Sequence, residues 1–183
     1  MNIDTKYQRS NDPAREHEFA RPLQTLLDRA AIHDLHMRYF NGADCGDRDV
    51  VRGCFSEDVS AQYEGRPPVQ GVEALLAQIT LFEALALGAC KISTHFTGNV
   101  QYRRLDAEVA HTEINAFAFL VSSDGRMVAM RSLRYLDELH RMEGQWRIAK
   151  RLHTLDWASE VPASFARDFV DKVSDLRALP PID

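Results

Sequence analysis

The sequence of 183 residues has few cysteines and lacks the motifs of several enzyme classes. Cys45, Cys54 and Cys90 form neither a CxxC pair nor a zinc-ligand spacing, so we expect reduced thiols rather than a disulfide framework. No glycine-rich loop has the pattern that binds dinucleotides, and no G-x-S-x-G motif occurs. We therefore expect a protein that needs neither a metal ion nor an organic cofactor.

Long apolar runs and clusters of basic residues are also missing. No stretch approaches the roughly 20 apolar residues of a membrane span. The N-terminal segment lacks the apolar core of a signal peptide, which favours a cytoplasmic protein. The 22 basic residues are scattered among 27 acidic ones, giving a formal net charge of −5. A nucleic-acid-binding surface is therefore not expected.

The first half of the sequence predicts helices interrupted by one strand. Residues 1–20 contain few apolar side chains and predict a flexible arm. A long helix is predicted over 23–43, because apolar side chains recur there every four residues, at Leu27, Ala31, Leu35 and Tyr39. Shorter elements follow in the order helix, strand and helix, over residues 49–55, 59–63 and 72–87.

The second half predicts an antiparallel meander of four strands, over residues 91–104, 109–121, 127–139 and 145–155. Ser123-Asp124-Gly125 and Glu143-Gly144 have the composition of hairpin turns. Helices segregated to one side of an antiparallel sheet define an α+β fold. We expect a cone-shaped α+β barrel with a single pocket, in which a curved, mostly antiparallel sheet wraps around the long helix.

The domain organisation follows from these elements. Residues 21–157 would form the one folded domain, preceded by the arm over 1–20. A short helix is predicted over 163–176, so residues 158–183 would form a C-terminal helical extension.

Four stretches resemble the SnoaL-like branch of the nuclear transport factor two-like superfamily. They are residues 30–44 (AAIHDLHMRYFNGAD), 56–71, 93–100 (STHFTGNV) and 134–151 (RYLDELHRMEGQWRIAKR). The family includes scytalone dehydratase, bile-acid dehydratases, hexachlorocyclohexane dehydrochlorinase, polyketide cyclases and steroid isomerases. Small, non-catalytic subunits of ring-hydroxylating dioxygenases also belong to it, so the fold alone leaves the function open.

The resemblance implies an acid–base centre formed by Tyr39, Asp44 and His95. An imidazole can accept a proton near neutral pH, and a carboxylate behind it fixes the tautomer and stabilises the imidazolium. Arg151 matches a basic residue that assists departure of the leaving group in the dehydrochlorinase. Taken alone, Asp44 also fits a helix-end aspartate, His95 a structural histidine, and Arg151 a surface arginine.

The walls of the pocket are predicted from strand alternation and from the same resemblance. Ser93, His95 and Thr97 share one strand face. The resemblance implies that the three later strands line the cavity with Asn115, Phe117, Phe119, Arg131, Leu133, Tyr135, His153 and Leu155. Asn115 would stand where related dehydratases place a second His or Asp. His33 and His36 have a spacing that could hold a metal, but no third ligand is indicated, and we interpret them as solvated or packing side chains.

These residues predict a lyase that acts on a hydrophobic aromatic or polycyclic small molecule. His95, oriented by Asp44, would remove a proton while Tyr39 and Arg151 assist the leaving group or an oxyanion. A carbon–carbon lyase, an isomerase or a cyclase could use the same centre. A non-catalytic subunit of a dioxygenase-like complex is the alternative from another class. The resemblance also implies a homodimer or homotrimer.

Overall fold

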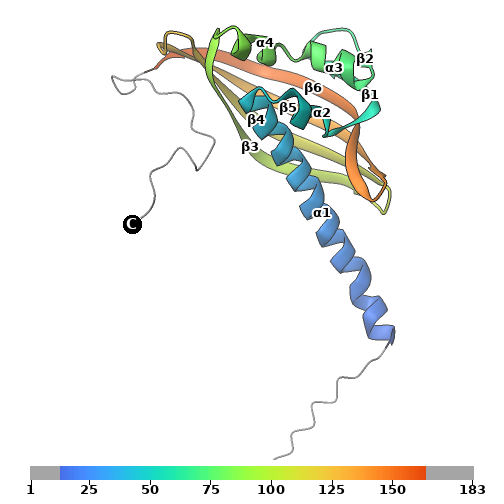
Figure 1. Ribbon diagram of the computed structural model, residues 1–183. Coiled ribbons are helices and arrows are strands. Elements are labelled where there is room, and N and C mark those ends of the chain that lie inside the picture. The colour runs from blue at the N-terminus through green and yellow to red at the C-terminus, as the bar shows by residue number, and fades with distance from the viewer. Residues whose placement is uncertain (1–12, 164–183) are drawn as a thin grey trace, which may run out of the picture.

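The computed structural model describes residues 13–163 of the chain (Figure 1). Ten elements follow one another in these residues: α1 (Pro13–Cys45), α2 (Arg48–Arg52), β1 (Phe55–Tyr63), β2 (Val69–Gln70), α3 (Val72–Gln78), α4 (Thr80–Ala86), β3 (Cys90–Leu105), β4 (Val109–Ser122), β5 (Met127–Met142) and β6 (Gln145–Pro162). The α+β fold class predicted from the sequence is confirmed.

Several boundaries differ from those predicted. Helix α1 begins at Pro13, so residues 13–20 are helical rather than part of a flexible arm. The single helix expected over 72–87 is divided into α3 and α4 at Ile79. Strand β6 continues to Pro162, which places residues 158–162 in the sheet and not in a helical extension. The helix predicted over 163–176 lies almost wholly outside the described residues.

The six strands form one sheet in the order β2-β1-β6-β5-β4-β3. Antiparallel pairing joins β3 to β4, β4 to β5 and β5 to β6, as expected for successive hairpins. β1 instead pairs with β6 in parallel, so the sheet is mixed. The sheet curves behind the C-terminal half of α1. Helices α3 and α4 lie at the end of the molecule where α1 ends (Figure 1).

Helix α1 packs on the sheet through a face spaced by three and four residues. Ile32, Leu35, Tyr39, Phe40 and Ala43 are buried along this face. In the predicted stripe only Leu35 and Tyr39 belong to the buried face, because Leu27 and Ala31 are exposed. Burial of each large apolar side chain on this face contributes about 1.5–3 kcal/mol.

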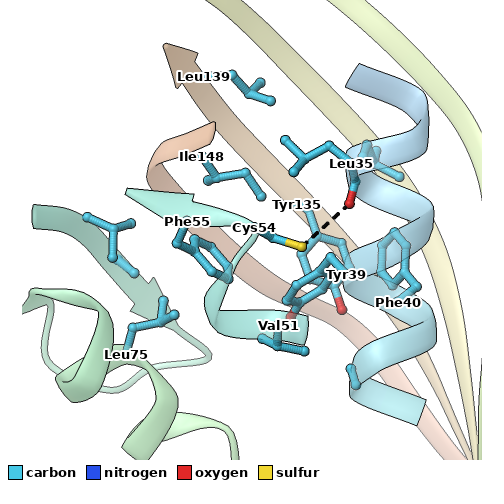
Figure 2. Close-up of a cluster of buried hydrophobic side chains, with 14 of the residues drawn as sticks. Leu35, Tyr39, Phe40, Val51, Cys54, Phe55, Leu75, Tyr135, Leu139 and Ile148 are labelled. Atoms are coloured by element: carbon cyan, nitrogen blue, oxygen red, sulfur yellow. Dashed lines mark hydrogen bonds between the residues drawn. The ribbon is translucent and has the colours of Figure 1, made fainter. Parts of the chain in front are cut away.

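The core between α1 and the sheet joins elements from both halves of the chain. Figure 2 shows Leu35 and Tyr39 of α1 among side chains of α2, β1, β5 and β6. Cys54, just after α2, is fully buried there, and its thiol donates to the Leu35 carbonyl oxygen at 3.8 Å. Burial raises the pKa of the Cys54 thiol, so this cysteine packs as a small neutral group.

A buried carboxylate fixes the middle of α1 to the far end of the sheet. Asp28 accepts hydrogen bonds from Arg141 of β5 and, at 3.4 Å, from the indole nitrogen of Trp146 in β6. Gln24, one turn earlier in α1, donates to the same oxygen at 3.0 Å. Asp28 therefore sets the angle at which α1 crosses β5 and β6.

Replacing this carboxylate is expected to destabilise the fold. Asp28→Ala should lower the free energy of unfolding by about 2–3 kcal/mol, because the Arg141 and Trp146 donors lose a charged acceptor. Chemical denaturation of the wild type and the variant measures the difference. Asp34→Ala, on an exposed position of the same helix, is the matched control. Equal losses in the two variants would contradict the anchoring role.

Candidate active site

The centre of the site is a pair formed by Asp44 and His95. Asp44 stands in the last turn of α1, and His95 lies in β3. The Asp44 carboxylate contacts His95 twice, through Oδ1 to the ring Nδ1 at 2.7 Å and through Oδ2 to the backbone N–H at 2.7 Å. Ser93 donates its hydroxyl to Oδ1 at 2.6 Å. The structure therefore brings together the two residues that the sequence predicted as a pair.

These contacts decide the ionisation of Asp44 and the tautomer of His95. Burial alone would raise the pKa of Asp44, but hydrogen bonds from His95 and Ser93 outweigh burial and lower that pKa. An ionised carboxylate can only accept, so Nδ1 of His95 carries the proton in this contact. In the neutral imidazole the other nitrogen, Nε2, is then the basic one.

The position of Asp44 is electrostatically costly for an ordinary aspartate. The C-terminal end of a helix carries partial negative charge, which disfavours a carboxylate there. No basic residue occupies the last turn of α1 to offset this effect. The charge is stabilised instead by three donors from β3, so the carboxylate depends on the strand that it positions.

A pocket opens beside His95 between the end of α1 and the concave face of the sheet. It is lined by Tyr39, Ala43, Tyr63, Glu64, Arg66, Gln78, Ile79, Thr80, Leu81, His95, Ala118, Leu120, Arg131, Leu133, Tyr135 and His153. Asp44 lies behind His95 and is not part of this lining. A second, more open hollow lies beside Leu136, Glu138 and Lys150, so the pocket is not single as predicted.

Two tyrosines and a buried arginine form a second polar group next to the pocket. The hydroxyls of Tyr39 and Tyr63 lie 3.0 Å apart, and Nη1 of Arg151 donates to the Tyr63 hydroxyl at 3.4 Å. Arg151 is itself paired with Asp137 through two bonds, of 2.8 and 2.6 Å. Its guanidinium lies 4.1 Å from the centre of the Tyr39 ring. This arginine is therefore neither on the surface nor in the pocket wall, but behind the tyrosines.

Tyr63 was not identified as a site residue from the sequence. It ends β1, and the only signal was its place on the alternating apolar face of that strand. The parallel pairing of β1 with β6 sets Tyr63 opposite His153. That pairing joins distant parts of the chain, so local sequence patterns do not reveal it.

His36 belongs to the same buried network and has no place in a metal site. Its ring lies 3.7 Å from Asp137 through Nδ1 and 3.3 Å from the Thr112 hydroxyl through Nε2. The side chain is fully buried, and burial lowers the pKa of His36 to about 4. Within the described part of the chain, no group of three or more His, Cys, Asp or Glu residues is arranged to hold a metal ion.

The predicted facing of β4 is wrong. His95 pairs with Ala118, so the inward side chains of β4 include Ala116 and Ala118. The residues of opposite parity lie on the outer face, where Asn115 and Phe117 are exposed and Phe119 is half-buried. A shift of one residue moves every side chain of a strand to the other face. The resemblance had implied the opposite parity, and the inward positions instead hold small alanines.

The strands β5 and β6 contribute Leu133, Tyr135 and His153 to the pocket wall. His153 stacks on Tyr63 with 4.8 Å between ring centres and contacts Tyr135 at 4.7 Å. Burial and the nearby Arg151 and Arg131 cations lower the pKa of His153 to about 3. His153 is therefore a neutral ring at physiological pH. Leu155 lies outside the pocket lining.

Comparison with known proteins places this geometry in a family. The SnoaL-like domain matches residues 24–152. The chain belongs to the SnoaL-like family. This confirms the resemblance inferred from the sequence. No curated protein sequence matches the chain significantly.

Solved structures share this SnoaL-like fold at low sequence identity. A candidate scytalone dehydratase from Novosphingobium aromaticivorans has 15% identity and a TM-score of 0.65, over 85% of this chain and 97% of that one. The dehydrochlorinase LinA-type3 from Novosphingobium barchaimii has 20% identity and a TM-score of 0.65, over 82% and 99%. A protein of unknown function from Mycobacterium tuberculosis has 27% identity and a TM-score of 0.62, over 73% and 74%. None of the helices within residues 13–163 is both long and apolar enough to cross a membrane.

The buried histidines His36 and His153 predict that the protein becomes less stable as the pH is lowered. Their pKa values are about 4 for His36 and about 3 for His153, whereas an unfolded histidine titrates near 6.5. Below about pH 6.5 these two histidines bind protons in the unfolded chain but stay neutral in the folded protein. The free energy of unfolding therefore decreases as the pH falls toward 4. Each histidine contributes a slope of up to about 1.4 kcal/mol per pH unit.

Denaturation curves between pH 8 and pH 4.5 measure this slope. His36→Gln should remove about half of the histidine contribution, and His153→Gln the other half, while stability between pH 7 and pH 8 should vary little from this source. A wild-type slope retained in both variants would show that neither ring is held neutral by the fold.

Proposed function

We propose that the protein is a cofactor-independent lyase that eliminates a small group from a hydrophobic molecule. The observation that carries the proposal is the Asp44–His95 pair, with His95 in the wall of a pocket that combines apolar and polar side chains. His95 accepts a carbon-bound proton at Nε2, and Asp44 stabilises the imidazolium that forms. The electrons of the broken C–H bond form the new double bond as the leaving group departs with its own bonding pair.

The leaving group is assisted by the Tyr39–Tyr63 pair. Tyr63 lines the pocket and accepts a hydrogen bond from Arg151. When Tyr39 is the donor in the Tyr39–Tyr63 contact, the Tyr63 hydroxyl proton is free to be donated to a departing oxygen. Burial raises the pKa of Tyr39, which keeps this hydroxyl protonated. Arg151 remains ion-paired with Asp137 and acts through the tyrosines rather than on the substrate.

The substrate class follows from the pocket walls. Alanine and leucine side chains line the pocket together with the rings of Tyr39, Tyr63 and Tyr135, which suits an aromatic or polycyclic molecule. The solved dehydratase-like and dehydrochlorinase relatives support elimination over isomerisation or cyclisation. The complete acid–base pair supports an enzyme over a non-catalytic subunit.

We also infer that the protein assembles into a homodimer or homotrimer through the outer sheet face. Phe96, Phe117 and Trp157 are 65%, 38% and 47% exposed, and strand pairing places them in one row across β3 to β6. A row of exposed aromatic side chains is typical of a surface that a partner covers.

Removing the base should abolish most of the activity. His95→Ala is expected to lower kcat by about 10²–10⁴-fold, and His95→Gln should not restore it, because an amide cannot accept the proton. Asp44→Asn should be similarly severe, and the double variant little worse than either single one, since the two residues act as a unit. Steady-state kinetics on a hydroxylated polycyclic substrate panel provide the measurement.

Folding must be measured on the same preparations, because Asp44 also joins α1 to β3. Circular dichroism of all variants gives this control. If folded His95→Ala protein has wild-type turnover, His95 is not the base and the proposed lyase mechanism is wrong.

The role of the tyrosine pair has a separate test. Tyr63→Phe should lower kcat by about 10²-fold with little effect on KM, because the lost hydroxyl acts on the leaving group. Tyr102→Phe is the control, since its hydroxyl donates to the Arg29 carbonyl oxygen, 3.1 Å away, and the residue does not line the pocket. If Tyr63→Phe and Tyr102→Phe have the same kcat, Tyr63 has no part in the chemistry.

A further inference from the structure

The pocket has a second polar region that the proposed mechanism does not use. It begins with Arg131 of β5, which lies in one row with His95 because Ala118 pairs with both. Neighbouring strands are about 4.8 Å apart, so the backbones of His95 and Arg131 are separated by about 10 Å. Between them the floor carries only the methyl group of Ala118, which leaves room for a flat ring.

Arg131 is paired on one side only. Its Nη2 donates to the carboxylate of Glu64 at the end of β1. Its Nε–H is buried and has no acceptor among the described residues. The ion pair therefore neutralises the charge of Arg131 but leaves one donor unused.

Gln78 supplies the complementary acceptor in the same pocket lining. Its amide nitrogen donates to the Pro67 carbonyl oxygen at 2.8 Å. A carbonyl oxygen only accepts, so the amide orientation is fixed and Oε1 is directed away from Pro67. This Oε1 is buried and meets no donor within residues 13–163.

His153 is the third member of the region. Its side chain is 7% exposed, lines the pocket, and lies between the rings of Tyr63 and Tyr135. Its Nδ1 is buried and lacks a hydrogen-bond partner in the described part of the chain. Burial keeps the ring neutral by lowering its pKa, and Arg151, Arg131 and His95 are the charged or titratable groups that add to this effect.

We propose that Arg131, Gln78 and His153 form a subsite that binds a neutral hydroxyl group on the ring of the substrate. A hydroxyl accepts one hydrogen bond and donates another, which matches an unused N–H, an unused carbonyl oxygen and an unpaired imidazole nitrogen on residues that line one pocket. A carboxylate fits less well, because it would face Oε1 of Gln78 and the carboxylate of Glu64. The subsite holds the ring over Ala118 with its far edge toward His95. The inference rests on the proposed function only in taking this pocket as the substrate site.

Binding of three probes at pH 7 tests the subsite without any turnover. Naphthalene has the ring alone, 2-naphthol adds a neutral hydroxyl, and 2-naphthoate adds a carboxylate. Dissociation constants from ligand fluorescence should show 2-naphthol binding about tenfold more tightly than naphthalene, with 2-naphthoate no tighter than naphthalene. Because the readout is binding, the result does not depend on whether His95 is the base.

Two variants separate the hydroxyl subsite from general affinity for rings. Arg131→Met should reduce the affinity for 2-naphthol to that for naphthalene and leave naphthalene binding unchanged. Glu64→Gln should strengthen binding of 2-naphthoate, because Arg131 then lacks its counter-charge. Arg126→Met, at an exposed position in the β4–β5 hairpin, is the matched control and should bind all three probes as the wild type does.

Three results would overturn the proposal. The first is a wild-type protein that binds 2-naphthol no better than naphthalene. The second is a preference for 2-naphthol that survives in folded Arg131→Met. The third is tightest wild-type binding of 2-naphthoate, which would indicate an anion site instead.

Discussion

The carboxylate of Asp44 is the contact on which the arrangement of the site depends. It joins the last turn of α1 to two residues of β3, and one of its bonds goes to the backbone of His95. The same group therefore fixes where the strand lies, which way the imidazole points and which nitrogen carries the proton. The ionised carboxylate that joins α1 to β3 lies at the C-terminal end of the helix. The helix dipole disfavours a negative charge at that end. Fold stability and chemistry are coupled at this one position.

The second buried ion pair, Arg151 with Asp137, has a different effect. Both side chains are fully buried, and the guanidinium has aromatic rings around it as well as two carboxylate bonds. Ion pairs of this kind add little net stability, because desolvation offsets the attraction between the charges. Their benefit is orientation. Arg151 fixes the hydroxyl of Tyr63, and its positive charge adds to burial in keeping the His153 ring neutral beside the pocket.

The sequence was sufficient to predict the fold class, the long helix, the four-stranded meander and the pairing of Asp44 with His95. These features have local signals or a family pattern. For the parity of β4 the family resemblance gave the wrong answer. The resemblance implied that Phe117 and Phe119 face the cavity, whereas the structure places Ala116 and Ala118 inward. Tyr63 and the partners of Arg151 depend on pairings between distant strands, which no local pattern encodes.

The parallel pairing of β1 with β6 has a consequence for how the protein is made. β1 lies early in the chain and β6 is the last described strand, yet Tyr63 and His153 are direct partners across them. Closing so long a loop is entropically costly, and such non-local pairings form slowly. A chain still emerging from the ribosome can form α1 and the β3–β4 hairpin, with Asp44 next to His95, while the opposite wall is absent. The pocket is completed only when β6 has been synthesised and added between β1 and β5.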